Sequence, residues 1–141
     1  MRHQVTVPIA APAATAWSLL ADLERWPRWT ASMTSVEPVG GGPLAPGLQV
    51  RVKQPKLREV VLEVMALDPG RSFTWASRSP GITTTAVHDI GETGPSTSEV
   101  TLTFEMVGPL GSVMGVLFGG LIRRYVQMEA DGLADAAGST S

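Results

Sequence analysis

The chain has 141 residues, with eleven Lys and Arg against thirteen Asp and Glu, so its charge gives no electrostatic reason to expect nucleic acid as a partner. A chain of this length is expected to form one domain with a sizeable core. It has no cysteine and only two histidines, which excludes disulfides and thiolate chemistry and leaves too few ligands for a histidine-based metal site.

The first part of the chain predicts a strand followed by two short helices. The segment HQVTVPIA alternates apolar and polar side chains, as a half-buried strand does. Pro12 suits the first turn of a helix, and APAATAWSLLADL keeps its apolar residues at helical spacing. A second short helix in ERWPRWTASM should end or kink at Pro27. Pro8 and Pro12 interrupt the apolar run that a signal peptide needs, so we expect a cytoplasmic location by default.

From MTSVEPV to about residue 106, the pattern predicts an antiparallel sheet. The segments that alternate in hydrophobicity or are rich in β-branched residues are LQVRVKQP, KLREVVLEVMAL, RSFTWASR, ITTTAVHDIGE and TSEVTLTFEMV. The breaks DPGR, SPG and ETGPST contain the Gly and Pro that hairpin turns need. Successive hairpins make the strands antiparallel, and such a sheet needs one face covered.

The only long apolar element that could cover the sheet is the C-terminal segment. At helical spacing, one stripe holds Leu110, Met114, Leu117, Leu121, Tyr125 and Met128. The uncharged stretch from Met106 to Ile122 has 17 residues and five glycines. This is shorter and less apolar than the ~20 residues of a bilayer span, so we expect no membrane span. A helix that lies on a surface or in a helix–helix seam stays an alternative.

Gly111, Gly115 and Gly119 recur every four residues in this segment. Each glycine costs about 1 kcal/mol relative to alanine inside a helix, so the row needs a reason. Two explanations are close backbone approach to a neighbour and space left open between helix and sheet.

This order of elements resembles the START-like superfamily, also called SRPBCC, and most closely its polyketide cyclase/dehydrase-like branch. The resemblance covers essentially the whole chain, and the motifs that carry it are IAAPAATAWSLLADLERWPRWTASM at 9–33, LAPGLQVRVKQP at 44–55, DPGRSFTWASRSPG at 68–81 and LIRRYVQMEADGL at 121–133. It implies an α+β helix-grip fold, in which a curved antiparallel sheet of about six or seven strands wraps around a long C-terminal helix, with two short helices after the first strand. We expect one ligand-binding domain over residues 1–135 and a disordered tail over 136–141.

The resemblance also implies a deep apolar cavity between sheet and helix, which favours open space as the reason for the glycine row. Gln54, Ser77 and His88 are polar residues on the inward, otherwise apolar strand faces, as in many ligand pockets. The residues expected to bind the ligand are Trp29, Gln54, Trp75, Ser77, His88, Phe104, Met114, Leu117, Phe118, Leu121 and Tyr125.

Each polar residue also has a purely structural explanation. His88 fits a buried histidine bonded to a backbone carbonyl or hydroxyl as well as a ligand contact or a general base. Ser77 could simply end its strand, and Gln54 could be satisfied by the backbone alone. Trp29 could anchor the short helices against the sheet. The pair Arg123-Arg124 lies off the apolar stripe and indicates a solvated face.

Two classes of function follow, and we favour the first. The first is the binding of a small apolar molecule, such as a lipid or polyketide, in the cavity. The alternative is a cyclase or dehydratase of polyketide-like substrates, with His88 as base and Tyr125 or Ser77 as hydrogen-bond donor. The inward strand faces hold no carboxylate that could orient His88, which weighs against catalysis. A protein-interaction module that uses the glycine row is a third alternative. We expect no cofactor, and the sequence leaves open whether the chain forms a homodimer.

Overall fold

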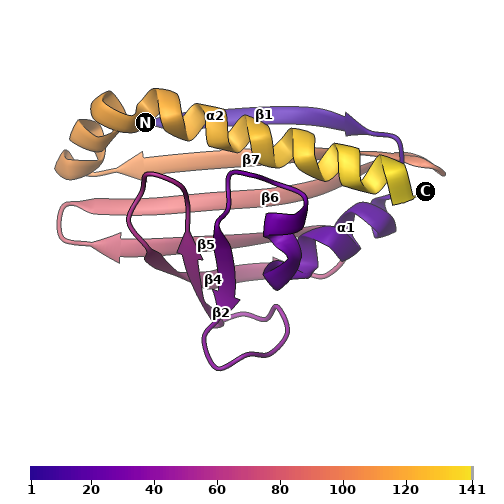
Figure 1. Ribbon diagram of the computed structural model, residues 1–141, viewed down its shortest axis with the longest axis horizontal. Helices are drawn as coiled ribbons and strands as arrows, with labels where there is room; N and C mark the ends of the chain where they lie inside the picture. The colour runs from indigo at the N-terminus through magenta and orange to yellow at the C-terminus, as the bar shows by residue number, and fades with distance from the viewer. Residues whose placement is uncertain (141) are drawn as a thin grey trace.

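The computed structural model describes residues 1–140, without the side chain of residue 140, and shows a seven-stranded sheet with helices on one face (Figure 1). The strands are β1 (Arg2–Ile9), β2 (Ser35–Pro38), β3 (Gln49–Lys53), β4 (Val60–Asp68), β5 (Ser72–Ser79), β6 (Ile82–Gly94) and β7 (Thr97–Val107). The helices are α1 (Ala13–Ala21), the 3₁₀ helix η1 (Leu23–Arg28) and α2 (Pro109–Thr140). The predicted order of elements is confirmed.

The sheet is antiparallel throughout, in the order β1-β7-β6-β5-β4-β3-β2. Hairpins join each strand from β2 onward to the next, and β1 returns to pair with β7. Gly70 and Gly81 adopt positive φ angles of 83° and 81° in the β4–β5 and β5–β6 turns, where a side chain would be strained. The predicted turns DPGR and SPG therefore have the expected chemistry.

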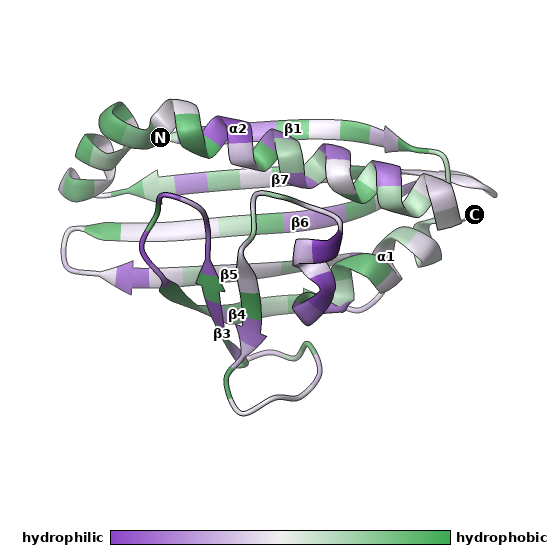
Figure 2. Cartoon of the chain, viewed as in Figure 1, coloured by the Kyte–Doolittle hydropathy of each residue, from purple (hydrophilic) through white to green (hydrophobic). Residues whose placement is uncertain are grey.

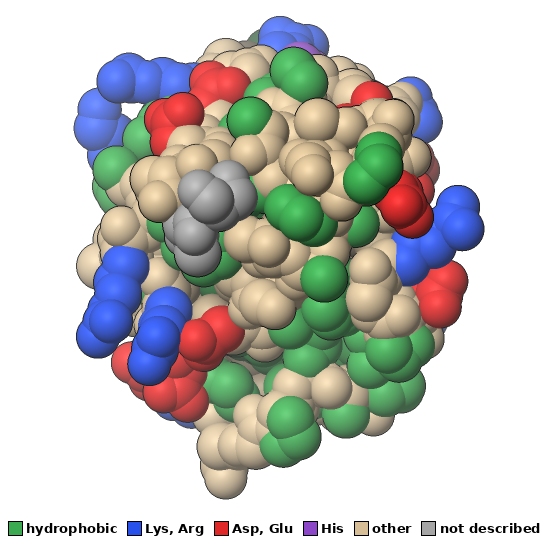
Figure 3. Space-filling view, turned by 90° about the vertical axis from the view of Figure 1, so that its right-hand side faces the viewer, with side chains coloured by type: hydrophobic (Ala, Val, Ile, Leu, Met, Phe, Trp, Pro, Cys, Tyr) green, Lys and Arg blue, Asp and Glu red, His purple; other side chains and the backbone are tan. Residues whose placement is uncertain are grey.

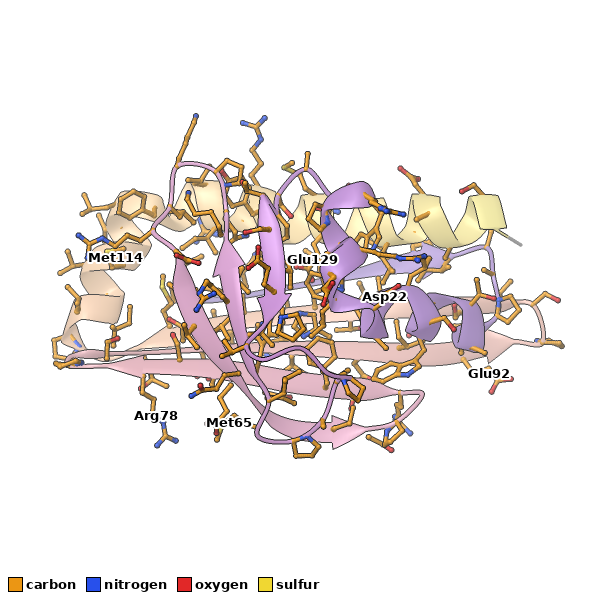
Figure 4. The ribbon with its side chains drawn as sticks, turned by 60° about the horizontal axis from the view of Figure 1, so that its bottom comes forward. Asp22, Met65, Arg78, Glu92, Met114 and Glu129 are labelled. Atoms are coloured by element: carbon orange, nitrogen blue, oxygen red, sulfur yellow. The ribbon has the colours of Figure 1, made fainter. Side chains whose placement is uncertain are left out.

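Helix α2 lies across the face of the sheet that α1 and η1 also occupy (Figures 1 and 4). Its first half is apolar or neutral, and charged residues begin only near its middle (Figure 2). Its second half is held in the hydrophobic core, because Ala130, Leu133 and Ala137 are wholly buried with Leu20 and Trp26. One end of the helix is thus a core element.

The predicted tail is wrong over residues 136–140, because α2 continues to Thr140. Ala137 lies four residues after Leu133 and carries on the same buried face of the helix. Small and polar composition suggested disorder, whereas packing of this face against the rest of the fold keeps the segment helical. Residue 141 lies outside the described residues.

No helix within residues 1–140 is apolar over enough length to cross a bilayer.

Candidate functional site

A cavity of about 280 Å³ lies between the sheet and α2. Strands β3 to β7 form one wall, α2 from Met114 to Glu129 forms the other, and residues 54–58 of the β3–β4 loop close one side. Figure 4 shows Met114 and Glu129 on the helix side of the sheet, whereas Met65 and Arg78 point from its opposite face. The lining is mostly apolar. The space expected from the resemblance is therefore present.

Most of the residues predicted to bind ligand line this cavity. On the sheet, Trp75 of β5, Ala86 of β6 and Phe104 of β7 are direct neighbours across the strands, so the period-two alternation placed this wall correctly. The predicted residues that line the cavity are Gln54, Trp75, Ser77, His88, Phe104, Met114, Phe118 and Tyr125. Whether they contact a ligand stays a prediction.

Leu117 and Leu121 do not line the cavity, and this part of the prediction is wrong. Leu117 is 68% exposed on the outer side of α2. Instead, Met114, Phe118 and Ile122 face the cavity. After Met114, each residue that faces the cavity lies one position later in the sequence than the leucine predicted for that place. Hydrophobicity alone selected the wrong rotation of the helix about its axis.

The glycine row explains part of this rotation. A Cβ atom at Gly115 would lie 3.1 Å from Cβ of Met1, and one at Gly111 would lie 3.3 Å from the backbone of Met106. Gly111 and Gly115 therefore face β7 and the residue before β1 and allow α2 to approach them closely, whereas a Cβ atom at Gly119 would meet nothing closer than 3.8 Å. The expectation of open space is wrong at Gly111 and Gly115, and the alternative of close backbone approach holds at Gly111, where the neighbour is the backbone of Met106.

Trp29 also lies outside the cavity lining. Its backbone packs against α2 at Gly132, where a methyl group would overlap the carbonyl oxygen of Trp29. Its ring lies 5.3 Å from that of Trp26, so Trp29 anchors η1, as the structural alternative proposed. Its indole N–H is buried without a hydrogen-bond partner in the described part of the chain.

His88 lines the cavity and is surrounded by three aromatic rings. Its imidazole stacks on Phe73, with ring centroids 4.2 Å apart and planes 8° apart. The rings of Trp26 and Trp75 approach it at 5.5 Å and 5.2 Å. Its Nδ1 lies 3.3 Å from the carbonyl oxygen of Phe73. The structural explanation for His88, a buried histidine bonded to a backbone carbonyl, describes this side of the ring.

The other side of the ring faces a carboxylate that sequence reasoning missed. Nε2 of His88 lies 3.4 Å from Oε2 of Glu129, and the side chains of the two residues are only 3% and 10% exposed. The strand faces contribute no carboxylate, as expected, but α2 does, so the argument against an oriented histidine no longer applies. A sequence signal existed, because Glu129 lies four residues after Tyr125 and eleven after Phe118 on one helical face.

Three atoms of this pair are in contact with other groups of the chain, and one oxygen is not. A carbonyl oxygen only accepts, so Nδ1 of His88 carries a hydrogen and donates it to Phe73. Nε2 of His88 faces Oε2 of Glu129 at 3.4 Å. Both nitrogens of His88 are therefore engaged. Oε1 of Glu129 has no hydrogen bond within residues 1–140 and is the acceptor left for a ligand.

The remaining polar groups of the lining differ in their availability. The Tyr125 hydroxyl donates to the carbonyl oxygen of Pro55 at 2.5 Å, so it ties the β3–β4 loop to α2 and has no hydrogen left for an oxyanion. The Trp75 indole, the Gln54 amide and the Ser77 hydroxyl make no hydrogen bond with the described part of the chain. These groups and Glu129 can orient a bound molecule.

Several solved structures share this helix-grip fold, and one of them is described as a START superfamily protein. The Zhui aromatase/cyclase from Streptomyces sp. R1128 is 17% identical, with a TM-score of 0.80 over 97% of this chain and 93% of that one. A START superfamily protein from Mycobacterium smegmatis is 17% identical, with a TM-score of 0.72 over 99% of both chains. The di-domain ARO/CYC StfQ from the steffimycin biosynthetic pathway is 19% identical, with a TM-score of 0.74 over 98% of this chain and 45% of that one. At these identities the likeness shows the fold alone.

No curated protein matches the chain by sequence. A family model does match it, over residues 2–138. The chain belongs to this family, which is described as polyketide cyclase / dehydrase and lipid transport.

Proposed function

We propose that the chain binds a small, largely apolar molecule carrying hydroxyl or carbonyl groups in the cavity between the sheet and α2. The observation that carries the proposal is the mostly apolar cavity of about 280 Å³ with a few unpaired polar groups on its wall. An apolar cavity of about 150 Å³ in another protein binds benzene, so this one has room for a larger ring system. Family membership supports the same class of ligand.

The polar groups of the wall define what the ligand should carry. Oε1 of Glu129 can accept a hydrogen bond from a ligand, and the indole N–H of Trp75 can donate one. A molecule with a hydroxyl group near a carbonyl group satisfies both, as a polyketide does. Apolar burial supplies about 25 cal/mol per Å² of affinity before the costs of binding, and these polar contacts select the orientation.

A matched pair of variants on β6 tests the site. Ala86 lines the cavity, whereas Thr85 precedes it on the strand and faces the opposite side of the sheet. We expect Ala86→Trp to fill the space and weaken binding of an apolar naphthalene probe at least tenfold, and Thr85→Trp to leave binding unchanged. Native mass spectrometry of the protein purified from its own host should also reveal a retained small molecule.

The interpretation needs a folded variant, which circular dichroism verifies. If Ala86→Trp does not fold, Phe118→Trp narrows the same cavity from the helix side. Wild-type affinity for the probe in a folded cavity variant would place the ligand elsewhere and refute the proposal.

The buried pair of His88 and Glu129 favours a second candidate function, the cyclisation and dehydration of a polyketide-like substrate. Oε1 of Glu129 would take a proton from a carbon between two carbonyls, and the resulting enolate carbon would attack a third carbonyl of the same molecule. The carboxyl group would return the proton to the new alkoxide, and loss of water would follow. His88 would act as a positioning residue, because both its nitrogens are engaged.

This second function predicts a specific separation of binding and rate. The protein should accelerate ring closure of a linear poly-β-ketone, followed by the absorbance of the aromatic product. Glu129→Gln should lower the rate about a hundredfold or more, the usual contribution of a general base, while the naphthalene probe still binds. Absence of acceleration by the wild type would reject catalysis and leave the binding function intact.

A further inference from the structure

The outer side of α2 exposes apolar side chains that nothing in the described chain covers. Leu110, Val113, Val116 and Leu117, here called the apolar tip, lie on one side of the first turns of the helix. Val116 is 86% exposed. Soluble surfaces rarely gather protruding aliphatic residues in this way without a function.

Positive charges without ion-pair partners lie next to the apolar tip. Arg123 and Arg124 follow it on the exposed side of α2, and neither forms a salt bridge within residues 1–140. Lys56 and Arg58 are exposed in the β3–β4 loop, which the Tyr125 hydroxyl holds against α2 through Pro55.

This end of the molecule contains few acids that could neutralise the cations. No Asp or Glu occurs between Met106 and Met128, although the whole chain has a net charge of −2. Glu59, next to the loop cations, is 3.3 Å from Arg51 and is thus already paired. The opposite end of the molecule, seen in Figure 3, shows acidic and basic side chains close together. The positive charge is therefore concentrated beside the apolar tip.

We propose that this end of the molecule docks on an anionic lipid surface, with the apolar tip inserted among the lipids and the cations against their headgroups. Apolar residues bordered by Arg and Lys are the pattern of interfacial helices. The apolar tip is aliphatic and protrudes, whereas protein interfaces rely on aromatic and Arg anchors that fit shaped pockets. A fluid bilayer accommodates such a protrusion without a complementary shape.

Docking in this orientation would bring the cavity to the membrane. Met114 and Phe118 line the cavity and belong to the same helical turns as Val113 and Leu117. An apolar molecule could then pass between bilayer and cavity without crossing water. The docking proposal does not depend on the ligand, because vesicle binding is measured with the protein alone.

Cosedimentation with vesicles tests the proposal with the full chain. We expect the protein to bind phosphatidylcholine vesicles that contain phosphatidylglycerol, and to bind vesicles of phosphatidylcholine alone at least tenfold more weakly. Arg123→Gln with Arg124→Gln should weaken binding about thirtyfold, from the usual contribution of two cations near an anionic surface. Val116→Asp with Leu117→Asp should abolish it.

Arg78→Gln is the matched control, because Arg78 is exposed but points from the opposite face of the sheet (Figure 4). It should leave vesicle binding unchanged. Equal binding to neutral and anionic vesicles, or none to either, would overturn the proposal. A third outcome would also overturn it. Light scattering would show a dimer for the wild type and a monomer for the Val116→Asp, Leu117→Asp variant, and the variant would bind vesicles as well as the wild type. The apolar tip would then join two copies of the chain.

Discussion

Breaking the buried pair of His88 and Glu129 should be much more costly than removing both of its members. In Glu129→Leu, the shape of the cavity wall is nearly kept, but Nε2 of His88 loses its partner. The His88 side chain is only 3% exposed, so water cannot replace that partner. An unsatisfied buried group costs about 1–3 kcal/mol, and an unpaired buried charge about 3–5 kcal/mol. We therefore expect the free energy of unfolding to fall by about 3 kcal/mol.

The double variant His88→Leu, Glu129→Leu removes both polar groups from the aromatic surroundings. Replacement of a buried pair by apolar residues is often nearly neutral, so the double variant should be more stable than Glu129→Leu alone. Urea unfolding followed by circular dichroism measures all members of this double-mutant cycle. An interaction energy below about 0.5 kcal/mol, the usual limit of additivity, would show that the two side chains do not interact and would refute this description of the site.

Three other predictions concern the helix and the loop beside it. Gly132→Ala should destabilise the fold by about 1–3 kcal/mol, because its methyl group would overlap the Trp29 carbonyl. In the control Gly120→Ala, the methyl group meets nothing within 4 Å, so this variant should be about 1 kcal/mol more stable than the wild type. Equal effects of the two variants in urea unfolding would contradict the close approach at Gly132. Amide hydrogen exchange should be faster over 110–120 than over the following turns, because this part holds four glycines and exposes one side; uniform exchange along α2 would argue against a weak first half. Tyr125→Phe should lower stability by about 1 kcal/mol and speed probe release in stopped flow, and an unchanged release rate would show that the bond to Pro55 does not restrain the loop.

The sheet could be predicted from the sequence because the pattern of a strand depends only on residues that are close in the sequence. Successive side chains of a strand point to opposite faces of the sheet, so the inward positions of Trp75, His88 and Phe104 could be predicted from their sequence neighbours alone. The helix was harder. Several rotations of α2 present a comparable apolar stripe, and the one adopted depends on which side chains of distant strands it meets.

The pair of His88 and Glu129 shows why the site was only partly predictable. The two residues are separated by 41 positions, and no local pattern connects a strand histidine with a helix carboxylate. For the glycine row, the resemblance favoured open space, and only the positions of Met1 and Met106 showed close approach at Gly111 and Gly115. In both cases the missing information was a long-range contact.

Helix α2 separates two tasks along its length. Its second half is fixed in the core by Ala130, Leu133 and Ala137, while Met114 and Phe118 of its first half border empty space. A change of side chain at Met114 or Phe118 therefore removes few packing contacts. Ligand preference can therefore drift between relatives, or be redesigned in the laboratory, while the folding of the domain remains under the control of other residues.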